Sequence, residues 1–355
     1  MEVAERVLMK GNEALGEAAI RAGCLFYYGY PITPQTELLE YMARELPKRG
    51  GTFLQTESEV ATIYYVYGTA AAGRRVMTAS SSPGISLMAE GMSFLATAQL
   101  PAVVVDIARA GPGLGRIPPA QSDYRQLTRG AGHGDYRMVV LAPASVQEMA
   151  DLAFLAFDLA DRYRNPVAIM ADGMLGQMME PLEWKPLPAD GHPADWAITG
   201  ARGRPRRLVL NAPFTDAELM ELNRVLAEKY RRIAEAEQRW EYVDMEGAEM
   251  AVVAYGTSAR IAMEAVEEAR HLGIPVGLIR PITLWPFPAR AFQPLLGKLK
   301  GCLTVEMNNG QMVEDVELAV RCSIPVHSYG QGGGWIPNTA GVREEVERVW
   351  QRLTS

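Results

Sequence analysis

The sequence predicts an α/β protein with a doubly wound, mainly parallel sheet and a second, smaller α/β domain. In the first half of the chain, short β-branched or aromatic runs alternate with longer amphipathic stretches, which is typical of a parallel sheet covered by helices. This alternation stops near residue 181 and returns near residue 248. At 355 residues the chain is long enough to build two such domains.

The first domain is expected over residues 1–180. Its predicted strands are Leu25–Tyr28, Thr52–Gln55, Arg75–Ala79, Ala102–Ile107, Met138–Leu141 and Pro166–Ala171. Its predicted helices, which carry apolar residues at three- and four-residue spacing, are Glu13–Ala22, Gln35–Leu46, Ser58–Ala72, Ile85–Gln99 and Val146–Tyr163.

A linker is expected over residues 181–247, where prolines are frequent and a charged helix is predicted at Asp216–Trp240. The basic run 202–207 is interpreted as a solvated stretch rather than a phosphate site. The second domain then covers residues 248–355. Its elements are strand Met250–Ala254, helix Ser258–Leu272, strands Val276–Ile279, Cys302–Glu306 and Pro325–Ser328, and helix Val342–Leu353.

Composition excludes several classes of function. The net charge of -7 argues against binding to nucleic acid. No apolar stretch reaches the length of a membrane span and no leader segment is apparent, so a cytoplasmic protein is expected. Cys24, Cys302 and Cys322 are far apart, and the sequence contains no C-x-x-C or H-E-x-x-H motif. Neither an iron-sulfur cluster nor another metal site is therefore predicted on this chain.

Two polar loops follow the first two strands. The loop Tyr30–Pro34 enters the next helix, and Thr33 followed by Pro34 also fits an ordinary helix N-cap. After the second strand, Glu59 stands at a helix start with capping-box spacing from Thr56, and Glu57 is its nearest rival for a functional role. Each loop alone has a structural explanation.

Two further loops follow the next strands. The segment Ser80–Gly84 offers hydroxyls and free amides at a helix N-terminus. Arg109 precedes a glycine-rich loop that does not fit G-x-G-x-x-G, so a dinucleotide site is disfavoured. An arginine at a strand end suits bidentate capture of a carboxylate, although a structural ion pair would explain it equally. All four loops should meet at the carboxyl edge of one parallel sheet.

Together these loops resemble the pyrimidine-binding α subunit of the 2-oxoacid:ferredoxin oxidoreductases, over nearly the full chain. The resemblance lies in Y-P-I-T-P at 30–34, Glu59, T-A-S-S-S-P-G at 78–84 and Arg109. It implies a thiamine-diphosphate pyrimidine-binding fold, followed by a transketolase C-terminal-like domain. The segments 132–137, 141–143 and 172–181 are most similar to the branched-chain (2-oxoisovalerate) type.

The resemblance also implies the site. Glu59 is the expected catalytic residue, which hydrogen-bonds the pyrimidine ring of thiamine diphosphate and favours loss of the thiazolium proton. Thr33, Arg109 and His133 are the expected substrate-binding residues, although His133 between two glycines fits a simple turn equally well. The remaining expected contacts to the cofactor are Tyr30, Pro31, Ile32, Ser80, Ser81, Ser82 and Gly84.

A missing motif implies partner chains. The G-D-G unit that binds Mg²⁺ and diphosphate in such enzymes is absent, since Ala171 precedes Asp172-Gly173, and Asn308-Asn309 lies in the other domain. A diphosphate-binding β subunit is therefore expected to share the thiamine diphosphate and hold Mg²⁺. A γ subunit and a ferredoxin-like subunit are expected to complete the complex, and partner chains would carry the iron-sulfur clusters.

The implied reaction is oxidative decarboxylation of a 2-oxo acid to acyl-coenzyme A, with reduction of ferredoxin. Several alternatives stay open. The substrate could be 2-oxoglutarate or pyruvate, or the chain could belong to an NAD-linked dehydrogenase complex or a transketolase-like synthase. A non-catalytic assembly subunit is the alternative from a different class.

Overall fold

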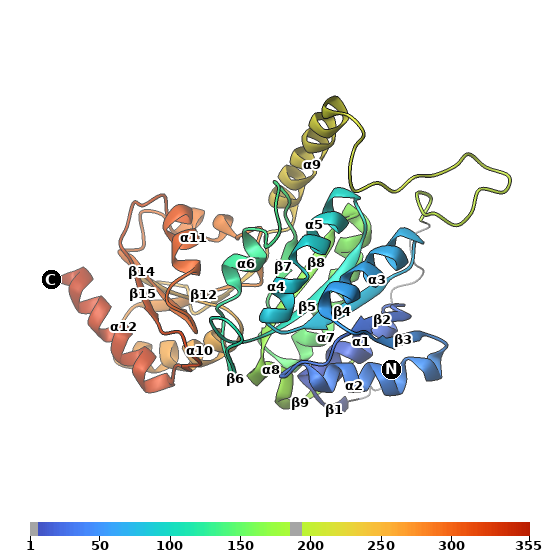
Figure 1. Cartoon of the computed structure of the whole chain (residues 1–355). Helices are drawn as coiled ribbons and strands as arrows, with labels where there is room; N and C mark the ends of the chain where they lie inside the picture. The colour runs from blue at the N-terminus through green and yellow to red at the C-terminus, as the bar shows by residue number, and fades with distance from the viewer. Residues whose placement is uncertain (1–5, 185–193) are drawn as a thin grey trace, which may run out of the picture.

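The computed structural model describes residues 6–184 and 194–355, which form two α/β lobes and a projecting helix (Figure 1). The first lobe is built on an eight-stranded sheet of order β13-β7-β8-β5-β4-β2-β3, with β6 paired to β5. All neighbours from β7 to β3 are parallel, whereas β6 and β13 run antiparallel. The strands are β2 (Phe26–Gly29), β3 (Thr52–Gln55), β4 (Val76–Ser80), β5 (Ala102–Ala110), β6 (Arg116–Pro119), β7 (Val139–Leu141), β8 (Pro166–Asp172) and β13 (Thr283–Trp285).

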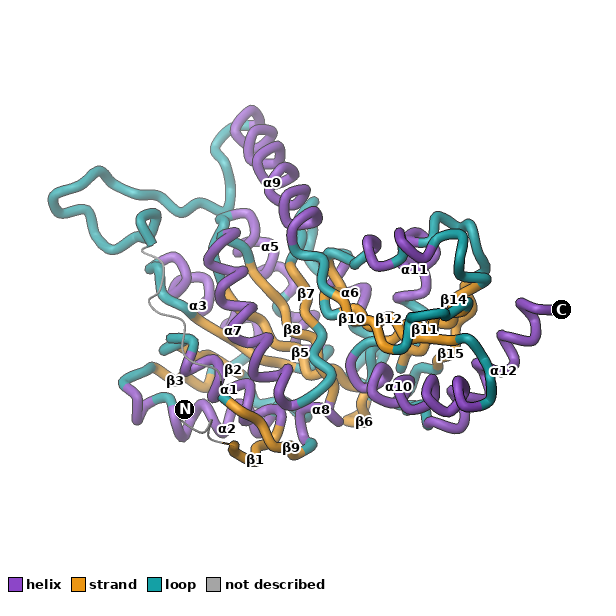
Figure 2. The backbone as a smooth tube through the Cα atoms, turned by 180° about the vertical axis from the view of Figure 1, so that it is seen from behind, coloured by secondary structure: helices purple, strands orange, loops and turns teal. Residues whose placement is uncertain are grey.

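Helices cover both faces of this sheet, as the front and back views show (Figures 1 and 2). On one face α3 packs on α4 and α5, and on the other α1 packs on α2 and α7. A separate two-stranded ribbon joins β1 (Arg6–Lys10) to β9 (Met179–Glu183). The helices are α1 (Gly11–Arg21), α2 (Thr36–Glu45), the 3-10 turn η1 (Pro47–Arg49), α3 (Glu59–Ala71), α4 (Pro83–Leu87), α5 (Ala89–Thr97), α6 (Tyr124–Thr128), α7 (Val146–Tyr163) and α8 (Gly173–Gln177).

The second lobe holds a five-stranded sheet of order β10-β12-β11-β14-β15, in which only β10 is antiparallel. Its own apolar core lies between this sheet and the packed helices α10 and α12. The strands are β10 (Trp240–Val243), β11 (Met250–Ala254), β12 (Val276–Pro281), β14 (Gly301–Glu306) and β15 (Val326–Gly330). The helices are α10 (Gly256–His271), η2 (Ala289–Ala291), η3 (Gln293–Leu295), α11 (Met312–Ala319) and α12 (Thr339–Thr354).

Helix α9 (Asp216–Ala236) projects from the body between the lobes (Figure 1). It begins at a capping box formed by Thr215 and Glu218. The buried residues of α9 all lie in its second half, and they are Leu226, Lys229, Tyr230 and Ile233. Only this second half is therefore anchored to the body.

The expected fold class is confirmed, while two helix predictions are wrong. The predicted helix Ile85–Gln99 is two helices, α4 and α5, separated at Met88. The predicted helix Asp216–Trp240 ends at Ala236, because Trp240 pairs with Pro281 as the first residue of β10. The short strands β1, β6, β9, β10 and β13 were not predicted, and neither were α6, α8 and α11.

The two lobes are joined by a buried hydrogen-bond network around Gln121, which is 2% exposed. Its side-chain amide donates to the Tyr255 carbonyl at 2.9 Å, and its side-chain oxygen accepts from the Ser258 hydroxyl at 2.8 Å. Nearby, the Tyr124 hydroxyl donates to Asp315 of the second lobe at 2.7 Å. Because these polar groups satisfy one another across the seam, the segment after β6 is fixed to both lobes.

None of the helices within residues 6–184 and 194–355 is long and apolar enough to cross a membrane.

Candidate functional site

The sheet topology brings the expected site residues to one edge. Strands β5, β4, β2 and β3 are consecutive neighbours and run parallel. Their carboxyl ends therefore lie side by side, and each expected loop leaves from one of them. This edge is where open α/β proteins bind ligands.

Glu59 is the first residue of α3 and is 6% exposed, whereas Glu57 is exposed. The capping-box interpretation of Thr56 and Glu59 is wrong, because Ser58 is the N-cap and its hydroxyl accepts from the Ala61 amide at 3.2 Å. Within the described residues, the Glu59 carboxylate makes no hydrogen bond and no ion pair. A buried carboxylate without a partner has its hydrogen-bonding capacity free for a ligand.

Gly84 allows this carboxylate to lie where it does. A Cβ atom at Gly84 would lie 2.6 Å from Glu59 Oε1 and 2.0 Å from Ser80 Oγ. The hydroxyls of Thr78, Ser80 and Ser81 are buried and have no hydrogen-bond partner. Glu59 therefore lies against the Ser80–Gly84 turn, and its unpaired carboxylate suits a ligand that carries a protonated ring nitrogen or an amino group.

Arg109 is buried and is the second-last residue of β5, so it belongs to the strand and not to the loop after it. Its guanidinium donates to the carbonyls of Thr33, at 3.0 Å, and of Leu114, at 2.7 Å. It forms no ion pair with a carboxylate of the described chain, so the structural ion-pair interpretation is wrong. Its Nε atom is buried without a partner. Arg109 therefore joins the first and fourth loops and retains one free donor.

The loop Tyr30–Pro34 lies along this edge, with Tyr30, Pro31 and Thr33 exposed and Ile32 half-buried. Thr33 is not a helix cap, because α2 begins at Thr36 with Gln35 as the N-cap residue. Gln35 is buried and donates to the Tyr30 carbonyl at 3.2 Å. The Thr33 hydroxyl makes no hydrogen bond within the described chain, so it is available to a ligand.

His133 is exposed, in a turn that packs against α5. A Cβ atom at Gly132 would lie 2.4 Å from the Ala89 carbonyl oxygen, which shows how closely this turn contacts the helix. No hydrogen bond or ion pair joins His133 to Thr33 or Arg109 in the described chain. The structure thus places the other expected residues at one edge and keeps His133 on a neighbouring turn.

Two acidic residues at this edge were not predicted. Asp106 in β5 is fully buried, and Asp123 at the start of α6 is 7% exposed. Both contact Ser82. The sequence does carry one signal for Asp106, a single charged residue inside the apolar run A-V-V-V-D-I-A at 102–108. This run was interpreted as an ordinary buried strand, and the charge was not considered.

A cavity of about 640 Å³ opens between the lobes beside this edge. The first lobe contributes Ser82, Arg109 and Asp123, and the second contributes Asn308, Gln311 and Gln331 among others. The lining is rich in amide and hydroxyl groups and includes the partly unpaired Arg109. The cavity therefore extends the candidate site toward the second lobe.

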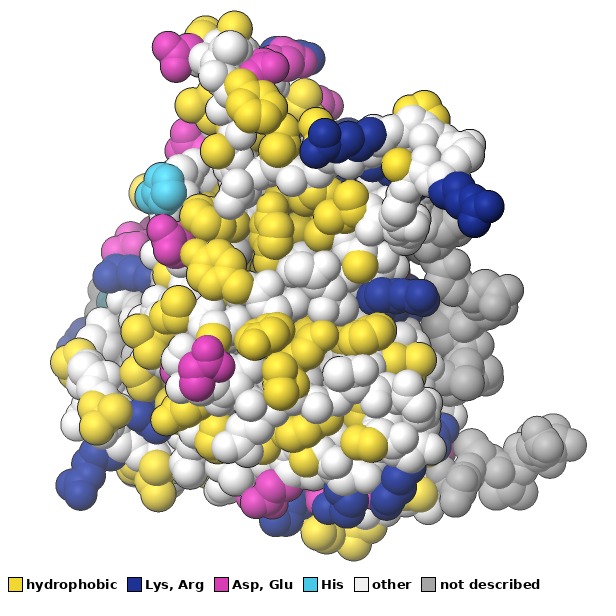
Figure 3. All heavy atoms as spheres, turned by 45° about the vertical axis from the view of Figure 1, so that its right-hand side comes forward, with side chains coloured by type: hydrophobic (Ala, Val, Ile, Leu, Met, Phe, Trp, Pro, Cys, Tyr) yellow, Lys and Arg dark blue, Asp and Glu magenta, His cyan; other side chains and the backbone are white. Residues whose placement is uncertain are grey.

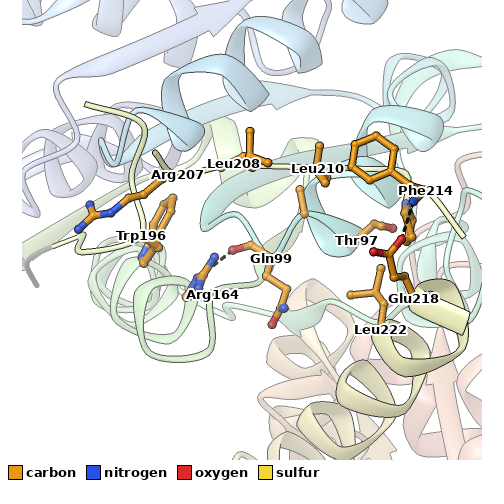
Figure 4. A pocket seen from close by; sticks show the side chains of 13 residues that line it. Thr97, Gln99, Arg164, Trp196, Arg207, Leu208, Leu210, Phe214, Glu218 and Leu222 are labelled. Atoms are coloured by element: carbon orange, nitrogen blue, oxygen red, sulfur yellow. Dashed lines mark hydrogen bonds between the residues drawn. The ribbon is translucent and has the colours of Figure 1, made fainter. Parts of the chain in front are cut away.

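A second cavity, of about 670 Å³, lies under α9 and is not part of this site (Figure 4). Gln99 and Arg164, which line it, come before β5 and β8, so it lies at the amino end of the strands. Arg164 stacks over Trp196 at 4.6 Å and donates to the Gln99 carbonyl at 3.2 Å. Of the basic run, Arg207 reaches this cavity. The run therefore lies away from Glu59.

The chain belongs to the family of thiamine-diphosphate-dependent 2-oxoacid:ferredoxin oxidoreductases, as the resemblance implied. Residues 17–196 match the family model "Pyruvate flavodoxin/ferredoxin oxidoreductase, thiamine diP-bdg". Residues 248–341 match "Pyruvate:ferredoxin oxidoreductase core domain II". Enzymes of this family consist of several subunits, and iron-sulfur clusters are carried on partner chains.

Two relatives cover almost the whole chain. The ketoisovalerate oxidoreductase subunit VorB of Methanothermobacter thermautotrophicus is 50% identical over 96% of this chain and 97% of its own. The 2-oxoglutarate synthase subunit KorA of Methanocaldococcus jannaschii is 37% identical over 96% of this chain and 98% of its own.

Solved structures agree with the fold. The 2-oxoglutarate:ferredoxin oxidoreductase of Magnetococcus marinus, with 2-oxoglutarate, coenzyme A and succinyl-CoA bound, superposes with a TM-score of 0.86 and 27% identity. The alignment covers 99% of this chain and 66% of that one, so this chain spans about two thirds of that subunit. A split-gene transketolase, 14% identical over 97% of this chain and 98% of its own, shares the fold alone with a TM-score of 0.61.

Proposed function

We propose that this chain supplies the pyrimidine side of the thiamine-diphosphate site in an oxidoreductase that decarboxylates a branched-chain 2-oxo acid, 2-oxoisovalerate, to its acyl-coenzyme A. The observation that carries the proposal is the buried Glu59 carboxylate, which has no partner of its own and faces Gly84 and Ser80 at the ligand-binding edge. Greater identity to the ketoisovalerate relative than to the 2-oxoglutarate relative supports the branched-chain substrate.

In this proposal each expected residue has one task. Glu59 hydrogen-bonds the pyrimidine ring nitrogen, where a carboxylate can exchange a proton with the ring. Arg109 and Thr33 orient the carboxylate and carbonyl of the substrate, and His133 on the neighbouring turn is a third substrate contact. When bound, thiamine diphosphate supplies the carbon nucleophile and the electron sink. Tyr30, Pro31, Ile32, Ser80, Ser81, Ser82 and Gly84 line the cofactor.

The proposal requires partner chains. A diphosphate-binding β subunit supplies Mg²⁺ and covers the Glu59 side of the site, where apolar side chains gather on the face over α3 and α4 (Figure 3). These include Val60, Tyr64, Tyr65 and Leu87, which are 39–55% exposed. A γ subunit and a ferredoxin-like subunit carry electrons to ferredoxin, and coenzyme A takes the acyl group. We place the complex in the cytoplasm.

Substrate profiling of the co-purified complex tests this function. Reduction of ferredoxin is measured with 2-oxoisovalerate, 2-oxoglutarate and pyruvate, each over a range of concentrations and with coenzyme A present. The expected result is the highest kcat/KM for 2-oxoisovalerate. A higher kcat/KM for 2-oxoglutarate or pyruvate would make that acid the preferred substrate. Absence of activity with all three acids would favour an assembly subunit.

A further inference from the structure

Asp106 is an ionisable residue in the centre of a buried strand. Every residue of β5 is buried, and Asp106 is fully inaccessible. Its Oδ1 atom accepts from the Ser82 amide at 3.2 Å, while Oδ2 has no hydrogen-bond partner in the described chain. Burying a carboxylate costs several kcal/mol unless it is paired or protonated, so this residue requires an explanation.

The carboxyl group of Asp123 lies beside that of Asp106. Ser82 links the two, since its hydroxyl donates a hydrogen bond to Asp123 Oδ2 and its amide donates to Asp106. The same hydroxyl oxygen accepts from the Arg109 amide at 2.9 Å. Ser82 is therefore held by two carboxyl groups and in turn holds the backbone of Arg109.

Ser82 needs this support because its backbone is strained. Its φ of 29° and ψ of -80° lie in a region that L residues rarely adopt. Strain of this kind typically costs on the order of 1–3 kcal/mol and persists only where surrounding contacts impose it. The strained residue separates Ser80 and Ser81 from Gly84, so it sets the turn that faces Glu59.

One proton shared by the two acids satisfies the network. Burial, followed by the nearby Asp123 carboxylate, raises the pKa of Asp106 well above its ordinary value. Burial also raises the pKa of Asp123, but the hydrogen bond from Ser82, the neighbouring carboxyl group of Asp106 and the charge of Arg109 oppose this effect. Tyr255 also lies near the pair, and its own pKa is raised first by burial and then by nearby carboxylates that include Asp123 and Asp106. Asp106 is thus the acid and Asp123 the anion.

We propose that Asp106 and Asp123 are positioning residues of the active site: Asp106, as a neutral acid, donates a hydrogen bond to Asp123, and the pair fixes the Ser82 turn between Glu59 and Arg109. The inference rests on the proposed function, since it concerns how the cofactor and substrate sides of that site keep their relative geometry. It assigns no contact with substrate to either acid.

Asp106→Asn and Asp106→Ala separate this role from a charge effect. Asparagine reproduces the neutral acid, because its Oδ1 accepts from Ser82 and its amide donates to Asp123. We expect Asp106→Asn to keep kcat/KM for the 2-oxo acid within about threefold of wild type. Asp106→Ala should lower kcat/KM roughly tenfold to a hundredfold, as expected when a buried charge loses its hydrogen-bond donor. Asp216→Asn, at an exposed position on α9 away from the site, is the control.

Two results would overturn the proposal: an Asp106→Asn variant as impaired as Asp106→Ala, or an Asp106→Ala variant with wild-type kcat/KM. If Asp106→Ala does not assemble, thermal stability of the Asp106→Asn complex from pH 5 to 9 decides. Wild type should lose stability relative to Asp106→Asn as pH rises, because its folded state keeps a proton that the unfolded chain releases near pH 4. A constant difference would show that Asp106 is ionised. Wild-type complex is the reference throughout, so inactivity of wild type itself would refute the proposed function instead.

Discussion

Glu59 and Arg109 differ in the hydrogen-bond partners that surround their side chains at this site. The buried carboxylate of Glu59 has no hydrogen-bond or ion-pair partner in the described chain. Arg109 is held by two backbone carbonyls, which orient the guanidinium without neutralising its charge. Carboxylate and guanidinium thus both keep free electrostatic capacity for ligands.

Glu59→Gln should slow exchange of the cofactor's thiazolium proton with deuterium by roughly a hundred- to ten-thousand-fold in the assembled complex, because an amide cannot exchange a proton with the pyrimidine. Thermal stability should change little, since the residue caps nothing and only about 0.3–1 kcal/mol of helix-dipole interaction is lost. Proton exchange is followed by NMR after acid quench. Glu57→Gln, at an exposed position, is the matched control. Slow exchange in that variant alone would mean that Glu57, and not Glu59, is the catalytic carboxylate.

Arg109→Lys should lower kcat/KM for the 2-oxo acid more than it weakens cofactor binding. Lysine keeps the charge but cannot donate to the Thr33 and Leu114 carbonyls in one plane and still offer a third donor. Initial rates at varied substrate concentration, with cofactor titrations alongside, measure both effects. Unchanged kinetics would mean that Arg109 only holds the two loops together and does not bind the substrate.

At the scale of elements, the long periodic segments of the fold were predictable and the special turns were not. Helix α7 and strands β5 and β8 follow from local apolar patterns. The strained Ser82 depends on contacts with Asp106 and Asp123, which are distant from it in sequence. Local periodicity carries no information about such contacts, so the sequence located the site loops but missed the acids that shape them.

Gly84→Ala should damage the site through one methyl group. The new Cβ would meet Glu59 Oε1 and Ser80 Oγ at distances that no real contact tolerates, so the carboxylate must move. We expect thiazolium exchange to slow at least tenfold, comparable with a lost acid-base contact. Gly68→Ala in α3 is the control, because a Cβ there meets nothing within 4 Å. Equal exchange rates in the two variants would contradict the contact.

Lys229 makes the anchoring of α9 depend on pH. It is buried and donates to the Arg164 carbonyl at 3.1 Å, and burial lowers its pKa to about 7, with Arg164 and Arg232 adding to the effect. The unfolded chain binds this proton up to about pH 10.4, so wild type gains stability as pH rises from 7 to 10. The free energy of unfolding of Lys229→Met minus that of wild type should therefore fall over this range, by on the order of 2–4 kcal/mol.

Denaturant unfolding at several pH values measures this difference. Lys48→Met is the control, because Lys48 is 61% exposed and its charge is lost without any change in burial. A difference that does not vary between pH 7 and 10 would mean that Lys229 stays charged in the folded chain.

For the whole molecule, the sequence predicted two α/β units but not how they join. The Gln121 network and the pairing of β13 with β7 connect segments more than a hundred residues apart. Neither leaves a local pattern in the sequence. The joined lobes nevertheless form only one side of the proposed cofactor site, in which Glu59 lies beside an exposed apolar face.

The isolated chain should therefore bind thiamine diphosphate with Mg²⁺ very weakly. It offers the pyrimidine side but has no G-D-G unit for the metal and diphosphate. Isothermal titration calorimetry on the purified chain, and then on the chain mixed with its partner, measures this. Tight stoichiometric binding by the single chain would refute a site shared between subunits, whereas binding that appears only with the partner would support it.

The position of β13 also has a consequence for biosynthesis. Thr283–Trp285 forms the edge of the first lobe's sheet, although the other strands of that sheet end at Asp172. A ribosome therefore releases the sheet's last strand only after the linker, α9 and half of the second lobe have emerged. Until then β7 is an open edge, and open edges pair readily with strands of other chains. A nascent chain stalled before residue 283 should aggregate more readily than one stalled near residue 355, from which residues 283–285 have left the ribosome.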